Sequence, residues 1–518
     1  MVVCINSLTF QGIGVLDVEV QVHISPGMPT FSIVGLPDKT ITESRERVRA
    51  ALASLGLILP AKKILVNLAP ADLIKEGSHF DLAIACGILT YLNIIPKDHV
   101  QEYIVLGELA LDGRILPVSG ILPAAIGANA RGKGMICAYE NGREAAWSGN
   151  TDILACHNIL SIINHFKGAQ ILTPAAIDAL SDDNTDNIND NIDLKHIVGQ
   201  EVAKRALEIA AAGGHNILMS GPPGSGKSML AKSMPSILPE MSFEEILECS
   251  MVYSVAGLIR DGKLTTERPF RAPHHSCSIA AMVGGGFSNR IKPGEISLAH
   301  NGVLFLDELP EFPGATVDAL RQPLEDGQVL IARSGVHVTY PAKFQLIAAM
   351  NPCKCGYLGD DTRGCNRAPK CGNDYLSRIS GPIFDRFDIN IEVPIVEPWR
   401  KNLTSKESSS DVARRIQRAR KIQLERYDGY GIRTNSELYG QLLTDYTCYD
   451  SAGLDILNKA GEHFKISMRS HNKILKVART IADLDNNPNV MYPHIAEALE
   501  YNRPTQQFAN FTQRLRGA

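Results

Sequence analysis

The stretch NILMSGPPGSGKSMLAKS, residues 216–233, decides how this chain folds. Residues 216–219 have the pattern of a short strand, GxxxxGKS follows, and a helical run comes next. Glycines let consecutive backbone N–H groups curl around an anion. The sequence therefore predicts a phosphate-binding loop formed by Gly221, Pro222, Pro223, Gly224, Ser225, Gly226, Lys227 and Ser228. We expect Lys227 to reach the β- and γ-phosphates of ATP and Ser228 to bind Mg²⁺.

Two later strands end in polar residues that suit the same site. An apolar run at residues 303–306 ends in Asp307 and Glu308, and a second run, residues 344–350, ends in Asn351. The carboxyl ends of parallel strands share one edge of a sheet, so Asp307 is placed to bind Mg²⁺ and Glu308 to polarise water. Taken alone, the acidic pair also fits a solvated strand end, and Asn351 before proline also fits a turn.

Composition excludes several classes of protein. With 518 residues, 44% hydrophobic and 21% charged, the chain is long enough for several domains and is not disordered or fibrous. The net charge of −4 gives no overall attraction to nucleic acid, so any polyanion site must be local. No apolar run is long enough to span a membrane, and residues 1–25 lack the pattern of a signal peptide. We expect a cytoplasmic protein.

The pattern of the chain predicts a multidomain α/β protein. Residues 1–167 mix strand-like and helical runs, whereas 168–193 contain a linker rich in Asp and Asn. Residues 194–398 alternate strands with helices, as in a parallel sheet. A polar linker at 399–411 then precedes a helical domain at 412–518.

A cluster of cysteines follows Asn351, within residues 353–371. Its members are Cys353, Cys355, Cys365 and Cys371. Four thiolates in so short a loop suit tetrahedral zinc, although the spacing is not that of common zinc ribbons and free thiols are the alternative. His274 and His275 could add ligands, but capping or packing explains them as well.

Several motifs together resemble those of one family. They are Gly199–Gln200, DELPEF at 307–312, AAMNPCKCGY at 348–357 and SGPIFDRFDI at 380–389. The combination resembles the magnesium-chelatase-like AAA+ ATPases of the ComM (YifB) type over nearly the whole chain. The resemblance implies a Lon-protease-like α+β N-terminal domain, an AAA+ P-loop domain with a parallel sheet, and a C-terminal helical lid.

The resemblance also implies a role for each site residue. Lys227 and Ser228 match Walker A, Asp307 and Glu308 match Walker B, Asn351 matches sensor 1, Arg386 the arginine finger and Arg469 sensor 2. A guanidinium suits the charge that develops on a transferring phosphate. For Arg386, the alternative is an ion pair with Asp385 or Asp388 in the same chain.

In the N-terminal domain, the segments at 77–89 and 106–125 resemble Lon protease. His79 takes the place of the nucleophilic serine and Leu122 that of the lysine, while the neighbouring Ser78 lacks the expected lysine. Because peptidase chemistry needs both groups, we expect the fold without the activity.

A hairpin is predicted at residues 329–345, around Arg333, Ser334 and Gly335. In the resembling clade such a hairpin points into a central channel, where copies of Arg333 and Lys292 would hold DNA phosphates; a solvated hairpin tip is the alternative. The basic run at 413–426 fits the wet face of a helix.

The resemblance implies a homo-hexameric ATPase that moves along single-stranded or branched DNA. Such a helicase would drive branch migration during natural transformation, with recombination proteins as further partners. The alternatives are a magnesium-chelatase-like ATPase that remodels a protein or assists metal insertion, and a nucleotide-switched scaffold.

Overall fold

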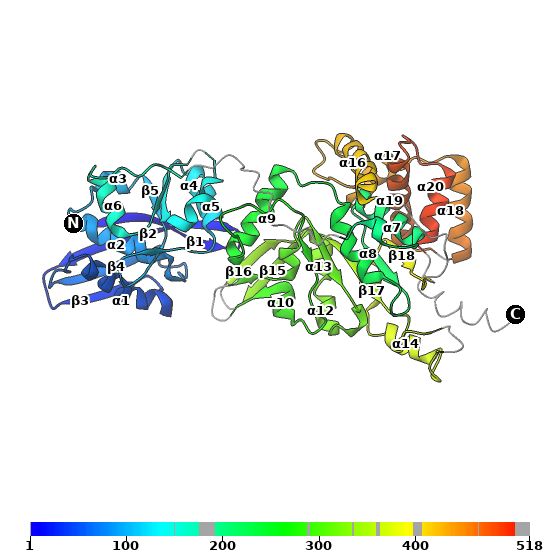
Figure 1. The fold of residues 1–518 in the computed structure, drawn as a ribbon, viewed down its shortest axis with the longest axis horizontal. Helices are drawn as coiled ribbons and strands as arrows, with labels where there is room; N and C mark the ends of the chain where they lie inside the picture. Colours follow the sequence, from blue (N-terminus) through cyan, green and yellow to red (C-terminus); the bar gives the residue numbers. More distant parts are fainter. Residues whose placement is uncertain are drawn as a thin grey trace.

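The chain forms three consecutive parts along the long axis of the molecule (Figure 1). The computed structural model describes residues 2–149, 151–175, 192–286, 291–333, 336–358, 363–396, 407–464 and 466–502. Most of the two expected linkers and the hairpin tip at Ser334 and Gly335 therefore lie outside the described residues.

The N-terminal part is built on a mixed sheet of seven strands in the order β3-β4-β2-β1-β5-β8-β9. Its strands are β1 (Val3–Gln11), β2 (Gly14–Ser25), β3 (Thr30–Val34), β4 (Lys63–Ala69), β5 (Tyr103–Val105), β8 (Gly134–Ala138) and β9 (Ile153–Cys156). A small hairpin, β6 (Glu108–Leu109) and β7 (Ile115–Leu116), accompanies it. The helices are α1 (Lys39–Ser54), α2 (Asp81–Tyr91), α3 (Lys97–Val100), α4 (Ile121–Ala130), α5 (Gly142–Ala146) and α6 (Ile159–Phe166).

Alternating apolar residues explain why β2 is a strand with one buried face. Val18, Val20, Val22 and Ile24 are buried, and the residues between them are less so. The nearly all-apolar α2 packs on β1 and β2 and is buried along almost its whole length. The expected mixture of strands and helices in this part is present.

The central part is a five-stranded sheet in the order β11-β14-β17-β10-β18, and all of its neighbouring strands are parallel. The strands are β10 (Ile217–Ser220), β11 (Phe270–Arg271), β14 (Val303–Leu306), β17 (Gln345–Met350) and β18 (Ile389–Glu392). The three central ones, β14, β17 and β10, are buried throughout, as their uninterrupted apolar runs predict. The expected parallel sheet is confirmed.

Helices cover both faces of this sheet, and two hairpins extend from it. The helices are α7 (Glu201–Gly213), α8 (Lys227–Ser233), α9 (Phe243–Ala256), α10 (Ile279–Val283), α11 (Glu295–Leu298), α12 (Gly314–Asp318), α13 (Arg321–Asp326), α14 (Lys370–Leu376) and α15 (Gly381–Phe384). The hairpins are β12 (Gly284–Gly285) with β13 (Lys292–Pro293), and β15 (Gln328–Arg333) with β16 (Val336–Pro341). The second is the hairpin expected from the sequence.

The C-terminal part is helical. It consists of α16 (Ser409–Arg426), α17 (Gly440–Tyr446), α18 (Ser451–Phe464), α19 (Met468–Leu484) and α20 (Tyr492–Tyr501). A capping box between Ser408 and Asp411 starts α16 three residues before the expected boundary at 412. The buried stripe of α19, which includes Ile474 and Val477, shares one apolar core with α7, β10 and β18. The helices are therefore continuous with the core of the central part.

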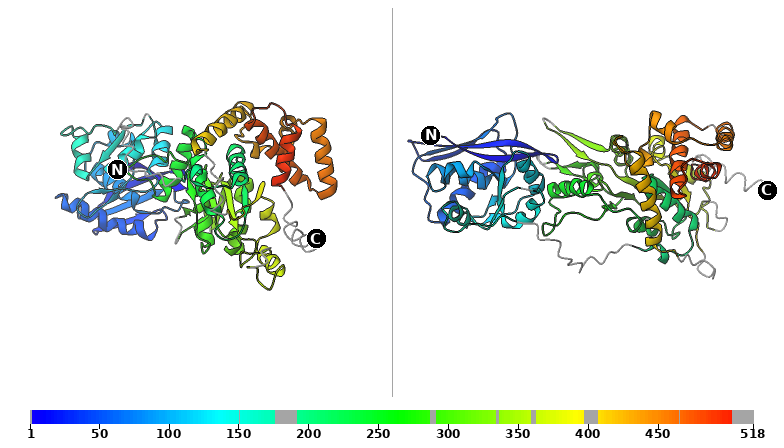
Figure 2. Two further views of the ribbon diagram at one scale, coloured as in Figure 1. Left: turned by 45° about the vertical axis from the view of Figure 1, so that its right-hand side comes forward. Right: turned by 90° about the horizontal axis from the view of Figure 1, so that it is seen from above.

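The N-terminal part docks on the central part at two places. Helix α4 packs on α9, where the Gly120 N–H donates to the Ser254 carbonyl (3.0 Å). The turn between β1 and β2 reaches the β15–β16 hairpin, as Figure 2 shows from above. There the Gln11 side chain donates to the His337 carbonyl (3.1 Å). Gly12 has φ 68°, and a Cβ at this position would lie 2.6 Å from the Thr339 carbonyl oxygen. Only glycine fits this contact.

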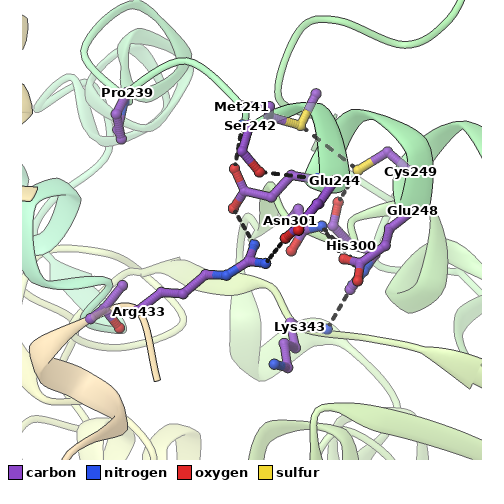
Figure 3. A network of polar contacts seen from close by, with 12 residues as sticks. Pro239, Met241, Ser242, Glu244, Glu248, Cys249, His300, Asn301, Lys343 and Arg433 are labelled. Carbon is purple, nitrogen blue, oxygen red and sulfur yellow. Dashed lines mark hydrogen bonds and ion pairs between the residues drawn. The ribbon is translucent and has the colours of Figure 1, made fainter. Parts of the chain in front are cut away.

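A polar network joins α9 to the C-terminal part and to the segments that precede β14 and β17 (Figure 3). His300 accepts the Lys343 N–H at Nδ1 (3.0 Å), so its Nε2 donates to Glu248 (3.2 Å). This hydrogen bond is the main reason that the pKa of Glu248 falls to about 2. At the other end of the network, Arg433 forms an ion pair with Glu244 (3.1 Å).

Candidate nucleotide-binding site

Adjacent parallel strands bring the predicted phosphate-loop and strand-end residues to one edge of the sheet. Strand β10 leads into the loop at 221–226, β14 into Asp307 and β17 into Asn351. Because β17 pairs with both β10 and β14 in parallel register, their carboxyl ends open on the same side. The loop is a backbone cradle in which Gly224 and Gly226 adopt positive φ values of 77° and 92°.

Lys227 lies inside this cradle and is nearly buried. Its ammonium donates to the carbonyl oxygens of Gly221 (2.8 Å) and Pro222 (2.9 Å) and to the Asn351 amide oxygen (3.3 Å). Burial lowers the pKa of Lys227, and the charges of Asp307 and Glu308 oppose that shift. The side chain is thus held at the place where a phosphate anion would satisfy it.

Ser228 and Asp307 lie in direct contact. The Ser228 hydroxyl donates to the Asp307 carboxylate at 2.6 Å, although the two residues are 79 positions apart. A hydroxyl and a carboxylate side by side, next to a phosphate cradle, are the oxygen ligands that Mg²⁺ prefers. The residues present therefore fit a magnesium–nucleotide site.

Glu308 has a strained backbone and an exposed side chain. Its φ of 54° and ψ of 48° are left-handed, which is uncommon for a residue with a Cβ, and its N–H donates to Asp307 (3.0 Å). The carboxylate lies 3.7 Å from His275 Nδ1. The structure thus places His275 beside Glu308 and not beside the cysteines. The sequence did not indicate His275 as a neighbour of Glu308.

Arg386 and Arg469 lie near the amino ends of the sheet's parallel strands, whereas Lys227 lies near their carboxyl ends. The Arg386 carbonyl accepts from Asn216, which precedes β10, whereas the phosphate loop follows that strand. Both arginines line a groove of about 790 Å³ at this edge.

Glu325 at the end of α13 holds both of these arginines. Its carboxylate forms an ion pair with Arg386 and lies 3.6 Å from Arg469. Arg469 also lies 3.9 Å from Asp385. The Arg386 side chain is only 8% exposed, and its Nε and Nη1 have no hydrogen-bond partner among the described residues. Sequence reasoning missed Glu325, because no local pattern sets it apart from other acidic residues at a helix end.

Three of the four predicted cysteines lie together directly after Asn351, and Cys365 falls outside this group. The sulfur atoms of Cys353, Cys355 and Cys371 are all within 4.8 Å of one another, and those of Cys353 and Cys355 are 3.0 Å apart. Cys365 borders them through hydrogen bonds to Cys355 and Cys371. A hydrogen bond from Cys353 lowers the pKa of Cys355 to about 7. In a tetrahedral zinc site, sulfur atoms are separated by about 3.8 Å. The three grouped cysteines could hold this metal if the sulfur atoms of Cys353 and Cys355 moved apart, and Cys365 is the candidate for the fourth ligand.

The two predicted DNA contacts lie at neighbouring hairpins. Arg333 ends β15, but its side chain lies outside what the structure describes. Lys292 is exposed on β13. The two hairpins pack together. The Ile331 side chain of β15 comes so close to Gly284 of β12 that a Cβ on this glycine would lie 2.7 Å from it.

Comparison with known proteins accounts for nearly the whole chain. The family model described as "Magnesium chelatase, subunit ChlI" matches residues 193–400, and models of the same subunit and of its C-terminal region match 20–141 and 406–502. Competence protein ComM of Haemophilus influenzae is 43% identical over 93% of this chain and 94% of its own length. The chain belongs to the ComM (YifB) family of magnesium-chelatase-like AAA+ proteins.

Other relatives agree with this assignment. An uncharacterised protein of the family, YifB of Escherichia coli, is 41% identical over 95% of both chains. The magnesium-chelatase 38 kDa subunit of Rhodobacter capsulatus is 28% identical, but over only 30% of this chain. Membership in the ComM family makes the central part an AAA+ nucleotide-binding domain, and the family implies ATP and Mg²⁺ as its cofactors.

Every helix in the described part of the chain is too short or too polar to span a membrane.

Proposed function

We propose that this protein is an ATPase whose active site is shared between neighbouring subunits of a homo-hexameric ring. The observation that carries the proposal is the division of the site between two edges of one sheet. Lys227, Ser228, Asp307 and Asn351 gather at one edge, while Arg386 and Arg469 lie at the other. A second copy of the chain would bring such arginines to the phosphates.

Each residue then has a defined task. The loop at 221–226 and Lys227 bind the phosphates, Ser228 and Asp307 hold Mg²⁺, and Asn351 orients the attacking water. Mg²⁺ neutralises charge on the phosphates when it is bound. Glu308 accepts the proton of the attacking water, which requires its carboxylate to turn away from His275.

We propose that Glu325 is displaced when a ring forms. In the single chain it supplies the negative charge that Arg386 and Arg469 need. The γ-phosphate of the neighbouring subunit would replace it, and loss of that phosphate on hydrolysis would return the arginines to Glu325. Because α13 leads directly into β15, this exchange also moves the β15–β16 hairpin.

The work done by the ring is proposed to be movement along single-stranded or branched DNA in the cytoplasm. Similarity to a competence protein, 43% identical over 93% of this chain, supports this function over metal insertion, whereas the family models named after the magnesium-chelatase subunit fit both functions. Arg333 and Lys292, on adjoining hairpins, are the proposed phosphate contacts. Branch migration during natural transformation, together with recombination proteins, is the process that such a motor would serve.

We propose that the N-terminal part is a Lon-like domain used for docking. His79 is buried, with its Nε2 3.1 Å from the Leu8 carbonyl, and Ser78 donates to Glu108. Leu122 is fully buried at the contact with α9, where its N–H faces the Ser254 hydroxyl (3.3 Å). The side chains at both positions that a peptidase would use, His79 and Leu122, are thus buried in packing contacts.

ATP turnover with and without forked DNA tests the DNA function. We expect forked DNA to stimulate turnover and to bind more weakly as salt rises, and Lys292→Ala to reduce that dependence on salt. Turnover that is unchanged by DNA, with no salt-sensitive binding, would favour remodelling of a protein partner instead.

A further inference from the structure

The four-cysteine cluster is joined to the nucleotide site by very short connections. Only Pro352 separates Asn351 from Cys353. The Asn351 side chain accepts a hydrogen bond from Lys227 (3.3 Å). One residue earlier, the Met350 carbonyl accepts the Gly221 N–H (3.2 Å). The connection from Cys353 to Lys227 and to the start of the phosphate loop is therefore short enough for a shift of Cys353 to reach both.

A second contact runs from the cysteine loop to the phosphate loop. A turn brings the Gly356 N–H to the Cys353 carbonyl (2.9 Å) and gives Gly356 a φ of 83°. A Cβ on Gly356 would lie 2.4 Å from Cδ of Pro223, so the backbone of the turn rests directly on the phosphate loop. The turn at 353–356 thus contacts the phosphate loop at Pro223 and is linked to Asn351 through Pro352.

The cysteine loop, residues 353–371, has few backbone hydrogen bonds among its described residues. Among its described residues, the backbone bonds are confined to short turns such as Ala368 to Cys365 (3.1 Å) and Cys371 to Arg367 (3.1 Å). Cys353 is buried, whereas Cys355 and Cys365 are partly exposed. Tyr357 and Leu358 of the cysteine loop are only partly buried, and a metal ion bound by thiolates would supply part of the free energy that orders the loop.

We propose that a Zn²⁺ ion bound by Cys353, Cys355, Cys365 and Cys371 sets the affinity of the phosphate loop for nucleotide. The ion fixes the turn at 353–356, and the turn fixes Pro223 and Asn351. The inference rests on the proposed nucleotide site, and it makes the metal centre a positioning element that does not touch the substrate. The proposed effect is geometric: a misplacement of about 1 Å in an active site can cost roughly 100-fold in rate.

The test compares metal content with nucleotide affinity in the same reduced, full-length protein. Zinc is measured by mass spectrometry and affinity with a fluorescent ATP analogue, before and after a zinc-selective chelator in excess Mg²⁺. We expect one zinc per chain, a roughly 5- to 150-fold weaker affinity for the ATP analogue after zinc removal, and recovery when Zn²⁺ is returned. Chelated protein that is zinc-free and binds the analogue as before would overturn the inference, as would reduced protein that contains no zinc.

Variants separate this inference from the nucleotide site itself. Cys371→Ser should lose zinc and affinity together, whereas Cys448→Ser, at an exposed cysteine of the helical part, should lose neither. Lys227→Ala should keep its zinc and bind the analogue roughly 10- to 150-fold more weakly. Zinc-loaded wild-type protein that binds no nucleotide would contradict the proposed function and leave the metal site standing. The chelation experiment on the wild type keeps the inference falsifiable if Cys371→Ser does not fold.

Discussion

Replacing Arg386 with alanine should stop ATP turnover without weakening ATP binding by the single chain. Arg386 lies beside the residue that precedes β10, and the phosphate loop follows that strand. The four residues of β10 span about 13 Å at 3.3 Å per residue, and this length separates Arg386 from the phosphate loop. Arg386 is therefore too far away to contact the nucleotide of its own chain, and in the proposed ring it would face the nucleotide of the neighbour.

The expected loss is large because the charge it balances arises in the transition state. Removal of an arginine finger lowers kcat by roughly 10³- to 10⁵-fold, or about 4–7 kcal/mol of activation free energy. The assay pairs steady-state ATP turnover with binding of a fluorescent ATP analogue under conditions that keep the chain monomeric. Glu325→Gln serves as the control: it removes the other half of the ion pair, and it should bind nucleotide normally and still hydrolyse it. An Arg386→Ala chain that loses analogue affinity as a monomer would refute this reasoning.

Two other predictions address the phosphate loop and the polar network of Figure 3. Lys227→Ala should weaken ATP binding by roughly 10- to 150-fold, the worth of a charge-assisted hydrogen bond; titration calorimetry that finds the wild-type affinity would remove Lys227 from the site. Glu248→Gln should lower the free energy of unfolding near pH 7. Because the pKa of Glu248 is lowered to about 2, the difference from wild type should persist above about pH 4.3 and vanish as the pH falls towards 2; a constant difference in urea titrations across that range would contradict the assignment.

The strand ends at the nucleotide site could be predicted from the sequence because their signals are local. The apolar runs before Asp307 and Asn351 end where β14 and β17 end, and GxxxxGKS fixes its own loop geometry. Parallel pairing then brings Ser228 and Asp307 together without further information.

Contacts between distant segments could not be predicted in this way. Glu325 meets Arg386 only because α13 and the start of β18 converge, and acidic residues at helix ends are common. For Arg386 the sequence suggested Asp385 or Asp388 as ion-pair partners, and the structure pairs it with Glu325 instead. The contact of Gly12 with Thr339 likewise joins two hairpins more than 300 residues apart. Such contacts depend on the packing of whole parts of the chain, which no sequence window contains.

The central claim is that neighbouring subunits complete each active site, and mixing two inactive variants tests it most directly. Glu308→Gln lacks the base beside its own nucleotide, and Arg386→Ala lacks the cation offered to the next subunit. In an equimolar random ring, half of the subunits keep Glu308 and half of their neighbours keep Arg386, so about one quarter of the interfaces are complete. We predict that the mixture regains about a quarter of wild-type ATP turnover. A mixture as inactive as its two components, in rings shown to contain both, would contradict the claim.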